Sequence, residues 1–457
     1  MFLDLDKKDS AAVAVIDDSG AQLTYGEICD FSAEFAARLP ARSLIFLLAE
    51  NRIGSLLGYT ACLSERIVPL ILSAKTETGL YERLRDLYRP AYLWAPEEMA
   101  SPYEPVFRAW GYVLLKTGFD SAPLYEDLAL LLPTSGSTGS PKLVRHSYRN
   151  IEANADNVRR LFGLTADERA MAVLPMHYTM GLSVIASHLL AGATLLLSGR
   201  SLLDRGFWAM LKEATSFTGV PYSYELLMKM RFTRMDLPNL RVITQGGGKL
   251  TPEMFTALAE YARDKGKRFI ATYGQSECTA RMAYLPAELA LEKTCSIGIA
   301  EPGGQLSIID ETGVETFEGE ATGEMVYRGE NVTLGYANSP DDLLKGDENH
   351  GVRRTGDLAR RDADGCYFIV GRLGRFLKIF GLRIGLDEVE NLVKAEFQAD
   401  CYCKGDDERL VVLVTDPALA DRLPAFIEEK THLFHKNIEV RLVDKILRNE
   451  AGKVINQ

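Results

Sequence analysis

Residues 134–142 consist almost wholly of glycine, hydroxyl side chains and one lysine, in the order Thr-Ser-Gly-Ser-Thr-Gly-Ser-Pro-Lys. Such a segment offers bare backbone N–H groups, hydroxyl donors and an ammonium group, a combination that favours binding of phosphate. The apolar residues 128–132 directly before it predict a buried strand. A Walker A loop needs glycine before the lysine and serine or threonine after it, whereas Pro141 and Leu143 flank Lys142. The sequence therefore predicts a strand and a phosphate-holding loop of another type, although an isolated segment of this composition is more often a flexible surface loop.

Length, charge and cysteine usage are typical of a cytoplasmic enzyme. The chain has 457 residues, enough for about three domains or subdomains. Its net charge is −11 and it has no basic stretch, which argues against nucleic acid as a partner. The N-terminus lacks a signal-peptide pattern, and the longest apolar region, 184–197, is too short and too interrupted to span a membrane. Seven cysteines without a C-x-x-C pair favour reduced thiols, and we expect Cys401 and Cys403 to pack in a strand.

The order of predicted elements indicates an α/β fold. A strand at 43–49, a polar-capped helix from Asn51 and a strand at 67–72 form a unit that normally builds a parallel sheet. Upstream, a hairpin over 13–23 precedes Thr24 and Glu27, which make a capping box. After the glycine-rich loop, helices near 149–161 and 182–190 alternate with strands near 169–174 and 194–197. Strands replace helices between residues 304 and 370, and a compact α+β tail follows Arg375.

Further motifs follow the loop in a fixed order. They are Tyr273-Gly274-Gln275-Ser276-Glu277, Gly323-Glu324, Thr355-Gly356-Asp357, Gly371-Arg372, Gly381-Leu382-Arg383-Ile384 with Glu388 and Glu390, and Gly452-Lys453. This ordered set resembles the adenylate-forming superfamily, which comprises acyl- and aryl-CoA synthetases, peptide-synthetase adenylation domains and luciferases. The resemblance implies a large N-terminal domain, 1–373, of layered α/β subdomains and a β-rich subdomain. A small mobile α+β domain, 374–457, would carry a catalytic lysine.

The same resemblance implies ATP-dependent activation of a carboxylic acid. The carboxylate attacks the α-phosphorus of ATP, pyrophosphate leaves, and the acyl-AMP passes its acyl group to the thiol of CoA or of a carrier-protein phosphopantetheine. Two anions must meet, so the site needs cations and aimed donors. Mg²⁺ needs few protein carboxylates, and by resemblance Glu277 supplies one. Thr138 and Ser276 would add hydroxyl contacts, with Thr138 among the catalytic residues.

We expect the nucleotide site to combine the loop, a flat slot and a ribose partner. Three glycines after the strand 240–244 allow close approach to a planar ring, on which Tyr273 could stack, although three glycines are also simply a turn. A carboxylate at Asp357 would accept hydrogen bonds from both ribose hydroxyls, with Arg372 as the second contact by resemblance. The complete set expected to bind ATP or AMP is Thr134, Ser135, Gly136, Ser137, Thr138, Gly139, Lys142, Gly246, Gly247, Gly248, Thr272, Tyr273, Gly274, Ser276, Asp357 and Arg372.

Three residues of the C-terminal part carry expectations that rest on the resemblance. Lys453 would bridge carboxylate and α-phosphate during adenylation, a task that suits a flexible ammonium group. Gly374 would be the hinge on which the small domain turns, in a position where the family usually has aspartate or lysine. Gly381 would line the thiol tunnel. The tail after Gly374 is shorter than the family's usual C-terminal domain, so surfaces that recognise the thiol carrier would be trimmed.

The acid is expected to lack an α-amino group. Residues 175–182, Pro-Met-His-Tyr-Thr-Met-Gly-Leu, resemble a segment of acyl- and aryl-CoA synthetases and contain no acid that would pair with an ammonium. His177 is a candidate contact for the carboxylate, with a packed histidine as an equal alternative. The apolar and aromatic residues expected around an aryl or medium acyl chain are Tyr178, Met180, Tyr222 and Met282.

Two other functions stay open at this stage. One is an amino-acid-activating or carrier-protein-specific ligase that does not use CoA. The other is a nucleotide-binding protein that keeps the fold without turnover. Lys142, Glu277, Asp357, Arg372 and Lys453 argue against the second, because a pure binder has no use for a catalytic lysine on a moving tail.

Overall fold

The computed structural model describes residues 1–99, 102–133, 142–379, 382–406, 408–448 and 454. Its residues divide into two compact units, Met1–Gln305 with Tyr327–Arg353, and Leu306–Val326 with Arg354–Gln457. Residues 306–326 and 354–373 thus group with the C-terminal part, whereas the sequence placed them in the N-terminal domain. The compact units do not show which residues move together, so the boundary of a mobile domain at Gly374 stays a prediction. Among the described residues, no helix has both the length and the apolar character needed to cross a bilayer.

The first unit contains a sheet of nine described strands with a parallel centre. Their order is β16 (Ile299–Ala300), β15 (Ala283–Tyr284), β14 (Arg268–Tyr273), β13 (Val242–Gln245), β12 (Ser216–Gly219), β10 (Arg169–Ala172), β11 (Thr194–Leu197), β1 (Val13–Asp17) and β2 (Gln22–Thr24). Neighbours from β14 to β1 pair in parallel. The predicted hairpin β1–β2 is confirmed, and Thr24 and Glu27 form the predicted capping box at the start of α1 (Tyr25–Ala36).

A second sheet of eight described strands contains the predicted strand–helix–strand unit. Its order is β20 (Gly335–Ala337), β9 (Leu143–Ser147), β8 (Leu128–Pro133), β4 (Val68–Ser73), β3 (Leu44–Ala49), β5 (Tyr92–Pro96), β7 (Tyr112–Lys116) and β6 (Glu104–Ala109). Strands β3 and β4 are parallel neighbours joined by α2 (Ile53–Ser64), as predicted. Strands β8 and β9, which flank the glycine-rich segment, are antiparallel neighbours. Helix α3 (Thr78–Tyr88) follows β4.

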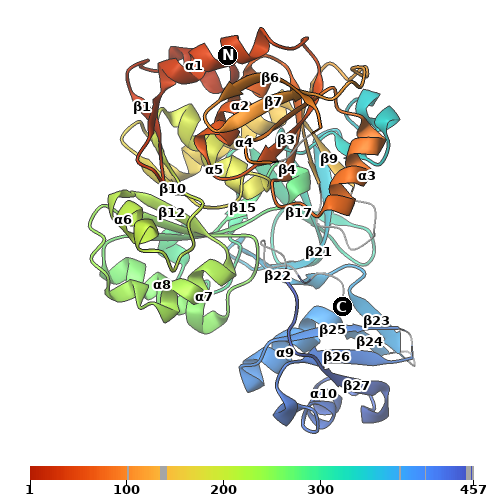
Figure 1. The fold of residues 1–457 in the computed structure, drawn as a ribbon. Helices are drawn as coiled ribbons and strands as arrows, with labels where there is room; N and C mark the ends of the chain where they lie inside the picture. Colours follow the sequence, from red (N-terminus) through yellow and green to blue (C-terminus); the bar gives the residue numbers. More distant parts are fainter. Residues whose placement is uncertain (100–101, 134–141, 380–381, 407, 449–453, 455–457) are drawn as a thin grey trace. The chain divides into compact units, whose positions relative to one another are not determined.

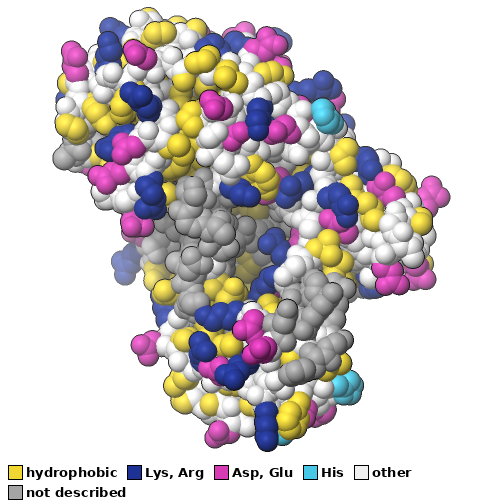
Figure 2. All heavy atoms as spheres, turned by 90° about the vertical axis from the view of Figure 1, so that its right-hand side faces the viewer, with side chains coloured by type: hydrophobic (Ala, Val, Ile, Leu, Met, Phe, Trp, Pro, Cys, Tyr) yellow, Lys and Arg dark blue, Asp and Glu magenta, His cyan; other side chains and the backbone are white. Residues whose placement is uncertain are grey.

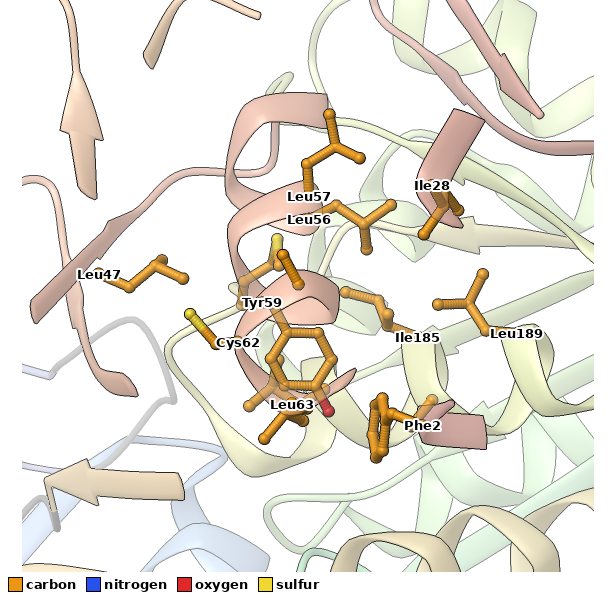
Figure 3. Close-up of a cluster of buried hydrophobic side chains, with 14 of the residues drawn as sticks. Phe2, Ile28, Leu47, Leu56, Leu57, Tyr59, Cys62, Leu63, Ile185 and Leu189 are labelled. Atoms are coloured by element: carbon orange, nitrogen blue, oxygen red, sulfur yellow. The ribbon is translucent and has the colours of Figure 1, made fainter. Parts of the chain in front are cut away.

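Helix α2 is buried on every side from Ile53 to Leu63, which explains its apolar composition. Figure 3 shows its side chains between Leu47 of β3 and the side chains Ile28, Ile185 and Leu189 of other helices. Close approach to the sheet requires glycine, because a Cβ atom at Gly58 would lie 2.4 Å from the Trp94 ring. The helix thereby ties the second sheet to the helices that cover the first.

The predicted polar cap at Asn51 is wrong. Arg52 stands at the N-cap position of α2 and makes no side-chain cap. The Asn51 amide instead donates to the carbonyl oxygens of Leu174 and Ser198, at 3.2 and 3.1 Å, and accepts from the Met176 N–H at 3.2 Å. These bonds link loops distant in sequence, so the side chain serves tertiary structure and not the helix end.

The remaining helices of the first unit alternate with its strands and are amphipathic or buried. They are α4 (Tyr148–Phe162), α5 (Thr179–Ala191), α6 (Arg205–Glu213), α7 (Pro221–Lys229) and α8 (Pro252–Asp264). Figure 1 shows α6, α7 and α8 gathered in the green part of the ribbon, around the C-terminal strands of the parallel sheet. Helices α4 and α5 begin within one residue and three residues of their predicted starts.

The strand-rich region and the tail also follow the predicted pattern. A five-stranded sheet among the described residues has the order β18 (Glu315–Thr316), β17 (Gly304–Ile309), β19 (Ala321–Gly329), β21 (Val352–Arg361) and β22 (Tyr367–Arg372). The tail contains β23 (Phe376–Ile379), β24 (Leu382–Gly385), α9 (Leu386–Phe397), β25 (Cys401–Gly405), β26 (Leu410–Val414), α10 (Leu423–Thr431) and β27 (Ile438–Leu442). Cys401 and Cys403 lie on β25 in the apolar core of this tail, as predicted. On the face in Figure 2, acidic and basic side chains of the described residues are interspersed.

Candidate functional site

The segments expected to bind nucleotide and acid follow neighbouring parallel strands. Gly219, Gln245 and Ala271 stand opposite one another in β12, β13 and β14. The next residues along the chain are the start of α7, the three glycines and the Tyr273–Glu277 motif. Because the carboxyl ends of parallel strands meet at one edge of a sheet, these segments are brought together where open α/β sheets bind ligands.

The three glycines form a closely packed loop at this edge. A Cβ atom at Gly246 would lie 2.7 Å from both Met180 Cε and Thr272 Oγ1, so a side chain would collide with α5 and β14. Gly247 has a φ of +76°, which favours glycine. The loop therefore contacts one residue predicted for the acid pocket, Met180, and one predicted for the nucleotide, Thr272.

The motif from Tyr273 to Glu277 is a tight turn closed upon itself. A Cβ atom at Gly274 would lie 1.4 Å from the carbonyl oxygen of Ala280, so no other residue fits there without moving the backbone. The Ala280 N–H donates to the carbonyl oxygen of Gln275 at 3.2 Å. This geometry explains the glycine and fixes the short helical turn Ser276–Cys278 that carries Glu277.

A buried segment, Asn331 to Tyr336, holds this turn in place. The Asn331 amide donates to the carbonyl oxygens of Cys278 and Arg281, at 3.0 and 2.9 Å. The N–H and the hydroxyl of Thr333 both donate to the carbonyl oxygen of Glu277, each at 3.0 Å. Four hydrogen bonds from one segment therefore fix the backbone at Glu277 and directly after it.

The buried carboxyl group of Glu301 accepts a hydrogen bond from the Asn331 side chain. Glu301 is 2% exposed, and its Oε1 accepts from Asn331 at 2.9 Å and from Tyr327 at 3.1 Å. Burial raises the pKa of Glu301 to about 8, against the opposing effect of its hydrogen bonds with Asn157 and Tyr327. Most of this carboxyl is accordingly protonated at neutral pH.

The Glu277 carboxylate lies between Arg353 and Tyr336, and a second cation, Lys142, lies over the Tyr336 ring. The Tyr336 hydroxyl donates to its Oε1, and Arg353 Nη2 lies 3.6 Å from the same oxygen. Lys142 Nζ lies 5.5 Å from the centre of the Tyr336 ring. The ring is placed by pairing of β20 with β9, in which Tyr336 stands opposite Val144, two residues after Lys142. Burial raises the pKa of Tyr336 to about 12, so its hydroxyl is a donor throughout the neutral range.

One oxygen of Glu277 fits a magnesium ion. Within the described part of the chain, no group donates to Oε2, and the side chain is 18% exposed. Mg²⁺ usually takes one or two protein carboxylates and completes its coordination with water and substrate phosphates. Among the described residues, no group of three or more His, Cys, Asp or Glu side chains forms a metal site. A single carboxylate therefore fits an ion that arrives with a polyphosphate.

The residues predicted to bind the acid lie at the start of α5 and nearby. His177 and Tyr178 are half-buried with ring centres 4.4 Å apart, directly before the helix. Thr179 Oγ1 lies 3.3 Å from Ser276 Oγ, which links this helix start to the Glu277 turn. Tyr222 is 60% exposed at the start of α7, whereas Met282 is fully buried. The roles of these residues in binding the acid stay predictions.

The second unit brings the two predicted ribose contacts together. Asp357 and Arg372 stand opposite each other in β21 and β22, and Arg372 Nε donates to Asp357 Oδ1 at 2.9 Å. Asp357 is 3% exposed, while the Arg372 side chain is 54% exposed. Gly356, directly before Asp357 in β21, has a φ of +71°. Both side chains are thus fixed to the same pair of strands.

Several predicted residues lie outside the described residues. They are Thr134, Ser135, Gly136, Ser137, Thr138, Gly139, Gly381 and Lys453. The predicted hinge Gly374 is described: it is exposed, its φ is +85°, and a Cβ atom there would meet no atom within 4 Å. The next residue, Arg375, binds Asp387 and Glu390, each at 2.6 Å, within the tail.

Comparison with known proteins identifies the family of the chain. The model of the family named AMP-binding enzyme matches residues 5–337. The chain belongs to this family. An indoleacetate–CoA ligase of Aromatoleum aromaticum is 32% identical over 341 residues, 71% of this chain and 65% of that protein. An oxalate–CoA ligase of Arabidopsis thaliana is 33% identical over 274 residues, 58% of this chain and 52% of that protein. The chain spans between about half and two thirds of the length of these relatives.

Solved structures of AMP-binding enzymes share the fold. The o-succinylbenzoate CoA synthetase MenE of Bacillus subtilis, solved with its acyl-adenylate intermediate, superposes with a TM-score of 0.78 at 20% identity, covering 99% of this chain and 96% of MenE. ATP-bound MatB of Rhodopseudomonas palustris gives a TM-score of 0.77 at 20% identity, with the same coverage of both chains. These structures confirm the predicted α/β architecture, and the family model confirms the family predicted from the motifs.

Sequence reasoning missed four residues of the site, Tyr336, Arg353, Asn331 and Thr333. Tyr336 and Arg353 lie 59 and 76 positions beyond Glu277 in the sequence, and no motif marks them. Their place depends on pairing of β20 with β9 and on the start of β21. The pair Arg353-Arg354 just before Thr355 was the available signal for one of them.

Proposed function

We propose that the protein is an acid–thiol ligase that activates a carboxylic acid with ATP, releases pyrophosphate and transfers the acyl group to a thiol. The observation that carries this proposal is the Glu277 turn at the carboxyl edge of a parallel sheet. There a carboxylate with an unbonded oxygen lies near Arg353 and is bonded to Tyr336, and Lys142 Nζ lies 5.5 Å from the centre of the Tyr336 ring. Membership of the AMP-binding enzyme family supports the reaction class.

In the first half-reaction, a carboxylate oxygen forms a bond to the α-phosphorus of ATP and the bond to the bridging oxygen of pyrophosphate breaks. Mg²⁺ bound at Glu277 would neutralise phosphate charge as pyrophosphate leaves. Lys142 and the segment 134–141 hold the phosphates, while Gly246–Gly248 and Tyr273 receive the adenine. Asp357 and Arg372 bind the ribose, and Lys453 balances the charge between carboxylate and α-phosphate.

In the second half-reaction, a thiolate sulfur attacks the acyl carbonyl carbon, and AMP leaves with the electron pair of the acyl–phosphate bond. The thiol belongs to CoA or to a carrier-protein phosphopantetheine, and Gly381 lines its path. Relatives named as CoA ligases favour CoA. Gly374 is the proposed pivot between the two half-reactions.

The acid is proposed to be an aryl or fatty acid without an α-amino group. Within the described residues of the helix-entry segment 175–182 no carboxylate is present, so an ammonium would be buried without a partner there. Among the relatives are ligases named for indoleacetate and for long-chain fatty acids.

All seven cysteines are described and none forms a disulfide, which supports a reducing compartment, the cytoplasm.

Product analysis across a panel of acids tests this proposal. Each acid is incubated with Mg·ATP and hydroxylamine, with and without CoA, and AMP, pyrophosphate, acyl hydroxamate and acyl-CoA are measured. We expect one class of aryl or fatty acids to give AMP and pyrophosphate in equal amounts, and acyl-CoA only when CoA is present. Nucleotide binding without turnover for every acid would indicate the silent binder. Turnover of amino acids alone would show that the substrate class is wrong.

A further inference from the structure

Arg353 is the second residue of β21 and points toward the Glu277 turn. Its side chain is 22% exposed, whereas that of the next residue, Arg354, is 65% exposed. Successive residues of a strand face opposite ways, and Arg354 accordingly binds Glu324, with its Nε 2.7 Å from the carboxylate. The two arginines are consecutive residues of the same strand, but their side chains face different surroundings.

The contacts of Arg353 are long for a guanidinium. Nη2 lies 3.6 Å from Glu277 Oε1 and 3.4 Å from the Tyr336 hydroxyl, and Nε lies 3.3 Å from Gln275 Oε1. Within the described part of the chain, Nη1 has no partner. Charge-assisted hydrogen bonds normally measure about 2.7–2.9 Å. The guanidinium therefore keeps most of its donor capacity for another anion.

More cations than carboxylates lie close to the Tyr336 side chain. The Arg353 guanidinium carbon lies 6.0 Å from the ring centre and Lys142 Nζ lies 5.5 Å from it, while Glu277 is the acid bonded to the hydroxyl. Two cations thus lie at the Tyr336 ring, whose hydroxyl is bonded to one carboxylate, before any metal ion is bound. A planar fork of N–H donors is suited to bind two oxygens of one phosphate.

We propose that Arg353 is a polyphosphate-binding residue, whose guanidinium contacts the β- and γ-phosphates of ATP and holds pyrophosphate until it leaves. The inference rests on the proposed function, since it assigns a new contact to the same site. The site would then have two cations that bind phosphate. One is Arg353 of β21, and the other is Lys142 at the end of the glycine-rich segment.

The test compares Arg353→Met with the neighbouring control Arg354→Met. Binding of Mg·ATP, Mg·pyrophosphate and AMP is measured by titration calorimetry on the full chain, and each variant is checked by its melting temperature. We expect Arg353→Met to weaken binding of Mg·ATP and Mg·pyrophosphate by about tenfold or more, the size of one charge-assisted hydrogen bond. AMP, which lacks the β- and γ-phosphates, should bind within about twofold of wild type. Arg354→Met should change none of the three.

Two outcomes would overturn the inference. Unchanged binding of pyrophosphate would show that Arg353 does not contact it. An equal loss for AMP would show that Arg353 acts through the shape of the turn. If Arg353→Met does not fold, Arg353→Lys is used, and it should still bind pyrophosphate more weakly because one ammonium replaces the two-pronged contact. Failure of the wild type to bind Mg·ATP would instead contradict the proposed function itself, and the inference with it.

Discussion

The conformation of Gly374 yields a quantitative test of the proposed hinge. With a φ of +85°, this residue occupies the left-handed region, and a Cβ atom added there would meet nothing within 4 Å. Gly374→Ala therefore introduces backbone strain without a steric clash. A non-glycine residue in this region costs about 1 kcal/mol, which shifts an equilibrium between two conformations about fivefold. Proline, with φ near −65°, excludes this conformation altogether, so Gly374→Pro would not preserve the arrangement described here.

If Gly374 is the pivot, alanine should change the balance between the two half-reactions. Adenylation is measured by pyrophosphate exchange, and thiol transfer by supplying pre-formed acyl-AMP with CoA. We expect their rate ratio to change about fivefold in Gly374→Ala, the factor given by the strain. Gly371→Ala is the matched control, because Gly371 lacks a positive φ and also has open space around its Cβ position. Equal ratios in the two variants, or an equal fall of both half-reactions with a lower melting temperature, would refute the hinge.

Three further predictions concern the site and its support. Tyr336→Phe removes the donor to Glu277 Oε1, and we expect a rise of about fivefold in the Mg²⁺ concentration that gives half-maximal pyrophosphate release, which corresponds to about 1 kcal/mol. An unchanged Mg²⁺ response would separate Tyr336 from the metal. Burial raises the pKa of Glu301 from 4.5 to about 8, so the folded state binds more protons than the unfolded state between these values, and stability from this group is present below pH 4.5 and is lost as pH rises through 8. The melting temperature should therefore fall less between pH 5 and 9 in Glu301→Gln than in wild type, and parallel curves would contradict the raised pKa. Lys453→Ala should abolish acyl-AMP formation while ATP affinity stays within about twofold of wild type, as assayed by pyrophosphate exchange and ATP titration, and full adenylation by this variant would remove Lys453 from the mechanism.

Local rules predicted much of the fold. The capping box at Thr24 and Glu27 and the parallel pair β3–β4 depend on residues close in sequence, and the structure contains them. The polar cap at Asn51 failed because its amide is bonded to loops more than 120 positions away. Tertiary hydrogen bonds overrode the local preference there.

The candidate site also contains some residues that the sequence could predict and others that it could not. Segments that follow parallel strands, such as the three glycines and the Glu277 turn, were predictable because strand ends meet at one edge. Tyr336 was not, since its position is set by the antiparallel partnership of β20 with β9 and by the buried Arg145, which donates to the Tyr336 carbonyl at 3.1 Å. Register between strands almost 200 positions apart leaves no local pattern in a sequence.

Transfer of ¹⁸O from the acid to AMP shows whether a carboxylate oxygen attacks the α-phosphorus of ATP. An accepted acid labelled with ¹⁸O in its carboxylate is converted to acyl-CoA, and the released AMP is analysed by mass spectrometry. We expect one ¹⁸O atom in each AMP, because the oxygen that joins the acyl group to phosphorus stays with AMP when the thiol attacks. Unlabelled AMP, with ¹⁸O in pyrophosphate or inorganic phosphate, would contradict it.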